Sequence, residues 1–164
     1  MLTYSLLDSP IGTLLLRHRN GQLTHVHFEA FPPEPSWTFV SPESDPAARQ
    51  VREYFTGERH VFDLDLAPEG TPFQQRVWQA LLQVPYGATC SYSDLARQLG
   101  DLKAVRAVGA ANGRNPIPII IPCHRIIGQS GKLIGYAGGL SIKQQLLALE
   151  RQHHPQTGAQ MTLF

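Results

Sequence analysis

Residues 123–125, Cys-His-Arg, are the part of this chain whose side chains could make a nucleophile. A thiol attacks as thiolate, and an adjacent imidazole and a flanking cation both favour loss of its proton. The triplet follows an apolar run in which Pro122 restricts its own φ and residues 119–121 predict a short buried strand. Taken alone, the pattern leaves open a reactive cysteine on a rigid segment and an inert buried thiol beside a surface histidine, and such a Cys-His pair is more often the second.

Motifs on both sides of Cys123 make this stretch specific. Asn115 stands eight residues upstream, and residues 135–139 form a Gly-Tyr-Ala-Gly-Gly loop before a last helix that ends at Glu150. Over residues 71–150 these motifs resemble the O6-alkylguanine-DNA alkyltransferases. The start of the chain, Asp-Ser-Pro-Ile-Gly at residues 8–12, resembles the N-terminal domain of the same family.

The resemblance implies a DNA repair protein that transfers the alkyl group of O6-alkylguanine irreversibly to Cys123, with O4-alkylthymine as a second candidate substrate. Because a thioether is not hydrolysed, each molecule would act once. His124 would generate the thiolate through a water, and Glu150 would orient the imidazole. Tyr92 would donate to the leaving guanine, and Asn115 would tie the active-site turn together.

A helix, a glycine turn at Gly100 and a second helix over 103–112 predict a helix-turn-helix. The resemblance implies that the second helix enters the minor groove of double-stranded DNA. Arg106 would then replace a nucleotide that is flipped into the protein. Small residues leave the thin helix surface that a narrow groove requires, and those expected to contact DNA are Ala104, Ala107, Gly109 and Ala110.

The base pocket is also implied by resemblance. Tyr136 would stack on the base, and Ala137, Gly138 and Ile126 would complete the pocket. Ala137 departs from family members that carry serine there. It keeps a backbone amide that could hold O6 but lacks a hydroxyl, so the reaction is more strongly indicated than the substrate range.

The first half of the chain predicts an antiparallel sheet followed by a helix. Strands are expected over 2–7, 13–17 and 22–28, with Asn20-Gly21 as a hairpin turn. The proline-rich segment 31–46 is expected to be a loop, 47–55 a helix and 61–66 a strand.

The second half is mainly helical. Thr71, Pro72 and Gln74 predict a capped helix start, and Ser93 is expected to cap the helix over 94–99. The fold class is therefore α+β, with an RNase H-like N-terminal sheet and helix and a winged helix-turn-helix-like C-terminal domain. The expected divisions are residues 1–70, 71–152 and a tail over 153–164.

Charge divides the chain in the same way. Residues 1–70 hold 5 Lys and Arg against 10 Asp and Glu, whereas residues 71–164 hold 9 against 3. A basic half that also carries Cys123 favours a polyanionic partner. The apolar runs are far shorter than the ~20 residues of a membrane span, and no signal-peptide start is seen. We therefore expect a cytoplasmic protein with free thiols at Cys90 and Cys123.

No metal and no diffusible cofactor are expected. His25 and His27 would share one strand face, but no cysteine precedes Cys90 to complete a zinc site. The expected state is a monomer, with cooperative binding along DNA left open. Two other function classes remain: a helix-turn-helix regulator with an incidental cysteine, and a Cys-His hydrolase. The small residues beside Arg106 favour the alkyltransferase over the regulator, and the helix pair disfavours the hydrolase.

Overall fold

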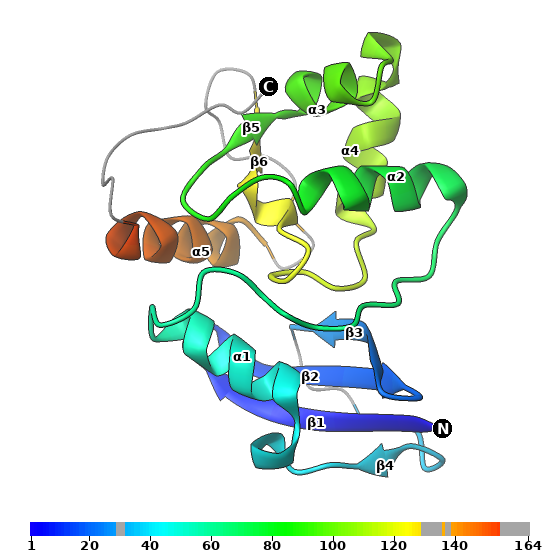
Figure 1. Cartoon of the computed structure of the whole chain (residues 1–164), viewed down its shortest axis with the longest axis vertical. Coiled ribbons are helices and arrows are strands. Elements are labelled where there is room, and N and C mark those ends of the chain that lie inside the picture. The colour runs from blue at the N-terminus through cyan, green and yellow to red at the C-terminus, as the bar shows by residue number, and fades with distance from the viewer. Residues whose placement is uncertain (29–31, 129–135, 137–138, 155–164) are drawn as a thin grey trace. The chain divides into compact units, whose positions relative to one another are not determined.

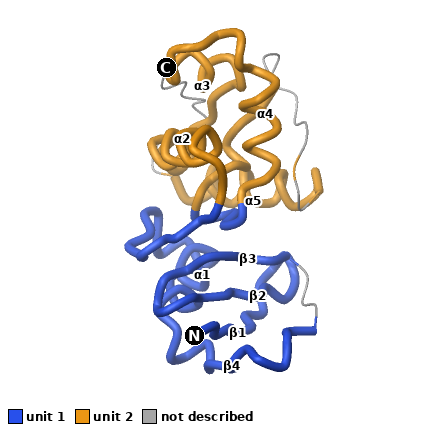
Figure 2. Tube along the Cα trace, turned by 90° about the vertical axis from the view of Figure 1, so that its right-hand side faces the viewer, with its two compact units in different colours: residues 1–69, 116–120 blue, residues 70–115, 121–164 orange. Residues whose placement is uncertain are grey.

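The computed structural model describes residues 1–28, 32–128, 136 and 139–154. The chain divides into two compact units (Figure 2). Unit 1 comprises residues 1–69 and 116–120, and unit 2 comprises residues 70–115 and 121–164. In the described part of the chain, no helix is long and apolar enough to cross a membrane.

Unit 1 is built on a four-stranded sheet in the order β3-β2-β1-β4 (Figure 1). Its strands are β1 (Leu2–Ser9), β2 (Gly12–Arg19), β3 (Gln22–His27) and β4 (Thr38–Phe39). The first three are antiparallel, and β4 pairs with β1 in parallel. The predicted hairpin is confirmed, because Asn20 and Gly21 have φ of 52° and 83°, and a tight turn with two positive φ angles matches the twist of the flanking strands.

Two expectations for unit 1 are corrected. The segment 31–46 is not only loop, because it contains β4 and the 3-10 helix Pro42–Ser44, and Phe39 packs its ring 5.5 Å from Tyr4. The strand expected over 61–66 is wrong, since only Leu66 forms a bridge, with Leu23. The Gln50 side chain hydrogen-bonds both backbone groups of Asp63, at 2.9 and 3.0 Å, so it supplies the bonds that a neighbouring strand would have made.

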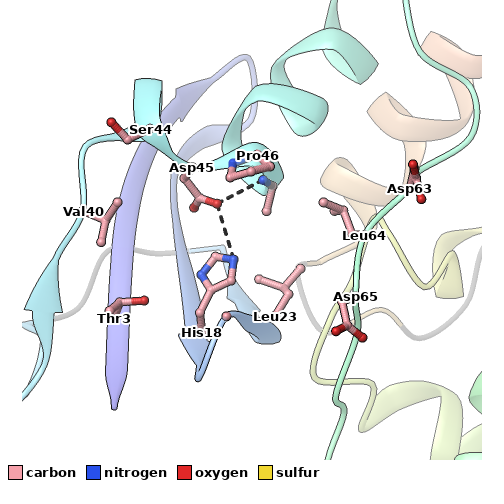
Figure 3. Close-up of a pocket in the computed structure, with 12 residues that line it drawn as sticks. Thr3, His18, Leu23, Val40, Ser44, Asp45, Pro46, Asp63, Leu64 and Asp65 are labelled. Atoms are coloured by element: carbon pink, nitrogen blue, oxygen red, sulfur yellow. Dashed lines mark hydrogen bonds and ion pairs between the residues drawn. The ribbon is translucent and has the colours of Figure 1, made fainter.

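Helix α1 (Pro46–Phe55) is tied to the sheet by the buried carboxylate of Asp45. Asp45 caps α1 by accepting from the amide of Ala47 at 3.0 Å, and it accepts from the Ser5 hydroxyl of β1 at 2.5 Å. His18 of β2 lies 3.4 Å away and, with Asp45, lines a cavity of about 320 Å³ (Figure 3). The Asp45 carboxylate and the His18 imidazole therefore help to hold α1 against β1 and β2.

On β2 and β3, Arg17, His25 and His27 form a cluster. The rings of His25 and His27 stack at 5.4 Å, which confirms that they share a strand face, and Arg17 Nη2 lies 2.6 Å from His25 Nδ1. Burial, and then the charge of Arg17, lower the pKa of His25 to about 4. Neutral His25 can accept from the guanidinium, whereas protonated His25 cannot.

Unit 1 is therefore expected to lose stability in mild acid. Because the folded pKa of His25 lies below its unfolded value of ~6.5, the unfolded state binds more protons between these values. The contribution of neutral His25 is fully present above the unfolded pKa and is lost as pH falls through about 4. Urea unfolding between pH 7 and 4 should show a shallower loss for His25→Gln, which keeps an acceptor for Arg17. Parallel pH dependences would contradict this role.

Unit 2 begins with α2 (Pro72–Leu81), and its predicted capping box is confirmed. The Gln74 amide donates to Thr71 Oγ1 at 3.1 Å, and the Thr71 amide donates to Gln74 Oε1 at 2.9 Å. The helix α3 (Tyr92–Gln98) is capped by Ser91 and not by Ser93. Ser91 ends a strand in extended conformation, and Asp94 lies three residues later to complete the reciprocal cap.

The remaining elements of unit 2 bring the motifs together. After Gly100, which has φ of 85°, the chain forms the 3-10 helix Leu102–Ala104 and α4 (Val105–Gly113). Strands β5 (Cys90–Ser91) and β6 (Ile126–Ile127) pair in parallel. The 3-10 helix Cys123–Arg125 precedes β6, and α5 (Leu140–His153) carries Glu150 three residues before its end.

The strand expected over 119–121 is wrong, although all three isoleucines are buried. Ile119 has φ of 74°, so the backbone turns here and cannot continue as a strand. Residues 116–120 belong to unit 1, where the Val26 amide donates to Pro116 O at 2.9 Å. The run is apolar because it is buried as a turn, and its prolines lack the amide that a strand ladder needs.

Candidate active site

Cys123 opens a short 3-10 helix directly after a turn that Asn115 closes. The side-chain amide of Asn115 donates to Ile121 O at 2.7 Å, and the backbone amide of Cys123 donates to the same carbonyl at 2.8 Å. Cys123 is 4% exposed. The side chain of Asn115 also hydrogen-bonds the thiol. Asn115 therefore contacts both the backbone and the sulfur of the candidate nucleophile.

The surroundings of the thiol oppose the effect of its burial. Burial raises the pKa of Cys123 to about 11, while a hydrogen bond from Asn115, the charge of Lys143 and the nearby Tyr136 act to lower it. Cys90, the other free cysteine, is also buried, and its pKa is raised to about 12 by burial and by the charge of Asp94. Among the described residues, a donor and a cation act on the sulfur of Cys123 and a carboxylate acts on that of Cys90, so a thiolate is better stabilised at Cys123.

Lys143 is a site residue that sequence reasoning missed. Its side chain is fully buried in α5, and Nζ donates to Ile126 O at 2.5 Å. Burial lowers the pKa of Lys143, and the nearby Cys123 raises it. The signal was available, because Lys143 shares helical spacing with Leu146, Leu147 and Glu150 on the inward face of the last helix. A lysine among core positions indicates a buried partner.

His124 and Glu150 come together from positions 26 residues apart. His124 Nε2 lies 2.6 Å from Glu150 Oε2, and both side chains are at most 1% exposed. This is the pairing that the family resemblance implied. Burial lowers the pKa of His124, although the Glu150 carboxylate acts to raise it. Burial thus favours the neutral form of His124, and with the hydrogen on Nε2 the Glu150 carboxylate is its acceptor.

The other nitrogen of His124 is left available. Nδ1 is buried and has no hydrogen-bond partner among the described residues. When Nε2 carries the hydrogen, Nδ1 holds a lone pair and can accept a proton. The bond between Nε2 and Glu150 thus leaves Nδ1 as the nitrogen through which His124 can act as a base.

Arg125 does not flank the thiol as the sequence suggested. Instead, its Nε and Nη2 donate to the two oxygens of Glu150 at 2.9 and 3.0 Å, and Nη1 donates to Val84 O at 2.7 Å. The amide of Gly87 adds a contact to Glu150 at 3.2 Å. Although burial alone would raise it, His124 and Arg125 hold the pKa of Glu150 well below its ordinary range. Glu150 is therefore a buried carboxylate with a full set of donors.

Two tyrosines lie near the thiol. Tyr92 opens α3, and burial, then the charge of Cys123, raise its pKa, while a hydrogen bond from Asn112 lowers it. Burial, and then the charge of Cys123, raise the pKa of Tyr136 well above its ordinary value. Ile126 is buried in β6. The other predicted pocket residues, Ala137 and Gly138, lie outside the described residues.

Helix α4 presents small side chains and one arginine to solvent. Arg106, Ala107 and Ala110 are exposed, whereas Ala104 and Gly109 are partly covered. The inward face is anchored by the Trp78 indole, which donates to Ala111 O at 2.9 Å. A Cβ on Gly109 would lie 3.8 Å from the Tyr92 ring, so α4 packs closely on that tyrosine. The helix thus joins an exposed thin face to the interior that holds Cys123.

Comparison with known proteins accounts for both units. A protein-family model described as "6-O-methylguanine DNA methyltransferase, DNA binding domain" matches residues 72–152. A second family model, for the ribonuclease-like domain of the same enzyme, matches residues 2–68. The chain belongs to this methyltransferase family. The resemblance and the fold class inferred from the sequence are thereby confirmed.

Individual members of the family extend over the whole chain. The methylated-DNA–protein-cysteine methyltransferase of Mycolicibacterium paratuberculosis is 50% identical, with 100% of this chain and 99% of that protein covered. The constitutive enzyme of Bacillus subtilis is 42% identical over 90% and 94%. The structure of Mycobacterium tuberculosis OGT in complex with DNA is similar with a TM-score of 0.85 and 47% identity, covering 94% of this chain and 96% of that one.

Among the described residues, no group of three or more His, Cys, Asp or Glu side chains is placed to hold a metal ion. The chemistry that the site offers is that of a thiol, an imidazole, two phenols and a buried ammonium group.

Proposed function

We propose that this methyltransferase repairs DNA by moving the alkyl group of O6-alkylguanine to Cys123, each molecule acting once. The observation that carries the proposal is the buried thiol of Cys123, faced by Asn115, Tyr136 and Lys143 and next to the His124–Glu150 pair. Membership of the family supplies the substrate class. The same proposal includes O4-alkylthymine as a second substrate, because the sequence has Ala137 where some family members have serine and so lacks that hydroxyl contact.

The reaction is a direct displacement at the alkyl carbon. The Cys123 proton passes through a water to Nδ1 of His124, and the resulting thiolate attacks the carbon. A new sulfur–carbon bond forms as the carbon–O6 bond breaks, and that electron pair remains on guanine. Glu150 stabilises the imidazolium, and Lys143 stabilises the thiolate before attack. The product is a thioether that water does not cleave.

The leaving guanine carries negative charge, so a donor at its ring lowers the barrier. We assign this donor to Tyr92, whose pKa is raised and whose hydroxyl therefore remains protonated. Tyr136 is proposed to line the base pocket, and the rise in its pKa, caused by burial and then by the charge of Cys123, supports a position near the reacting sulfur.

The partner is double-stranded DNA, approached by α4 through the minor groove. The exposed Ala107 and Ala110 allow close approach, and Arg106 occupies the stack when the damaged nucleotide is rotated out. Flipping is required because the O6 substituent is out of reach inside a duplex, and it costs a few kcal/mol that protein contacts offset. Residues 71–152 would supply both the DNA contacts and the transfer chemistry, with the protein acting as a monomer.

The test is the mass of the intact protein after incubation with duplex containing O6-methylguanine. One methyl group per molecule should appear, mapped to Cys123 by peptide analysis, and substoichiometric protein should leave the excess substrate unrepaired. A DNA-binding regulator or a hydrolase would show no mass change. Repeated turnover would disprove the single-use mechanism.

A separate measurement tests Arg106. Arg106→Ala should slow repair of a duplex by more than tenfold and should slow reaction with the free base by much less, because only the duplex needs a flipped nucleotide. Binding of the wild type should weaken steeply with salt as phosphate counterions are released. Arg151→Ala, which removes an exposed arginine of α5, is the matched control. Equal losses on duplex and free base would mean that Arg106 supports the pocket or the fold.

A further inference from the structure

Asn112, near the end of α4, is a buried amide that the mechanism above does not use. Its side chain is 3% exposed, on the same inward face of the helix as Val108 and Ala111. Nδ2 of Asn112 donates to Cys123 O at 3.4 Å, and the same side chain hydrogen-bonds Tyr92. One residue of the DNA-reading helix therefore contacts both the backbone of the nucleophile and the phenol beside it.

The direction of these bonds matters for Tyr92. Asn112 Oδ1 has no hydrogen-bond partner among the described residues, so the amide meets Cys123 and Tyr92 as a donor. A phenol oxygen that accepts from Asn112 leaves its own hydrogen free to point elsewhere. The hydrogen is then available for a base that enters the pocket.

The unpaired Oδ1 of Asn112 also indicates a role other than stabilising the fold. A buried carbonyl oxygen without a partner costs stability, and an apolar residue of the same shape would avoid that cost. Asn112 is thus a poor choice for the core alone. Residues of this kind are expected where function and stability conflict.

We propose that Asn112 is a positioning residue for alkyl transfer. It orients the Tyr92 hydroxyl so that its hydrogen faces the leaving guanine, and it ties that hydroxyl to the turn that carries Cys123. The inference rests on the proposed function, because donation from Tyr92 to guanine is part of that function. It adds the residue through which α4, the helix that meets DNA, acts on the reacting groups.

The first experiment needs no substrate. Protein labelled with ¹³C at Cζ of tyrosine is titrated by NMR, and Tyr92→Phe identifies the signal of Tyr92. Asn112→Leu should raise the pKa of Tyr92, since the bond from Asn112 lowers it. Asn112→Ala, which adds no bulk, should do the same. An unchanged titration of Tyr92 in both variants would overturn the proposal.

The second experiment measures single-turnover transfer from O6-methylguanine duplex. Asn112→Leu should be about tenfold slower than wild type, the loss expected from one hydrogen bond that acts in the transition state. In a Tyr92→Phe background the same substitution should cost less than about twofold, because its target is gone. Equal slowing in both backgrounds would overturn the proposal and assign Asn112 to the Cys123 turn.

Thermal melts separate positioning from folding. Asn112→Leu should melt no lower than wild type, because it removes an unpaired buried oxygen. Thr89→Val is the matched control: its hydroxyl is also buried without a partner among the described residues, and its loss should leave the rate unchanged. If wild-type protein gained no methyl group, the proposed function would fail, while the NMR titration would still decide the contact between Asn112 and Tyr92.

Discussion

Cys123→Ser is expected to bind duplex containing O6-methylguanine as wild type does and to take no methyl group from it. A hydroxyl is far less acidic than a thiol, and the donors and the ammonium group around position 123 are too weak to ionise it. The size of the side chain hardly changes, so the turn closed by Asn115 should remain. Binding is measured by fluorescence anisotropy, and transfer by intact mass.

Cys90→Ser is the matched control for this experiment. Cys90 is as buried as Cys123, but Asp94 and not a cation acts on its thiol. Its substitution should leave the transfer rate unchanged at a temperature where the protein is folded. The assignment would be wrong if Cys123→Ser gained a methyl group, or if only Cys90→Ser lost the ability.

Sequence reasoning succeeded where the signal is local. The hairpin at Asn20-Gly21 follows from two residues that tolerate positive φ, and the capping box of Thr71 and Gln74 follows from spacing alone. The Cys-His pair was recognisable for the same reason. Its link to Glu150, in contrast, came from family resemblance, because no local rule connects residues 26 apart.

The failures concern contacts made at long range. Residues 119–121 read as a strand because they are apolar, but tertiary packing buries them in a turn. Residues 61–66 alternate like a strand, yet the backbone groups of Asp63 bond the Gln50 side chain and not a neighbouring strand. A sequence pattern reports that a segment is buried and does not report which groups will take its hydrogen bonds.

Arg125 shows the same limit at the active site. Because Arg125 is next to His124 in sequence, it suggested a cation for the thiol, but its guanidinium makes a bidentate pair with Glu150. The Glu150 carboxylate consequently contacts both the Arg125 guanidinium and the His124 imidazole. Its negative charge is maintained by Arg125, so that it can stabilise His124 when the imidazole takes a proton.

Glu150→Gln is expected to slow alkyl transfer, while binding of duplex DNA stays close to wild type. The neutral amide can still contact His124 but stabilises the imidazolium less. His124→Ala should slow transfer at least as much, by ~10²-fold or more, because the general base is lost. The double variant should be hardly slower than His124→Ala, since Glu150 has no target without the imidazole. Single-turnover rates at several pH values provide the measurement.

The contact with Arg125 requires a control, because Glu150→Gln also removes the partner of a buried guanidinium, a change that costs about 3–5 kcal/mol of stability. Rates must therefore be taken well below each melting temperature. Arg125→Met tests whether loss of this pair alone slows transfer: it should lower the melting temperature and still leave His124 and Glu150 coupled. If the double variant of His124 and Glu150 showed the product of the two single losses with folding intact, the relay would be refuted, and Glu150 would act only through Arg125 as a support of the fold.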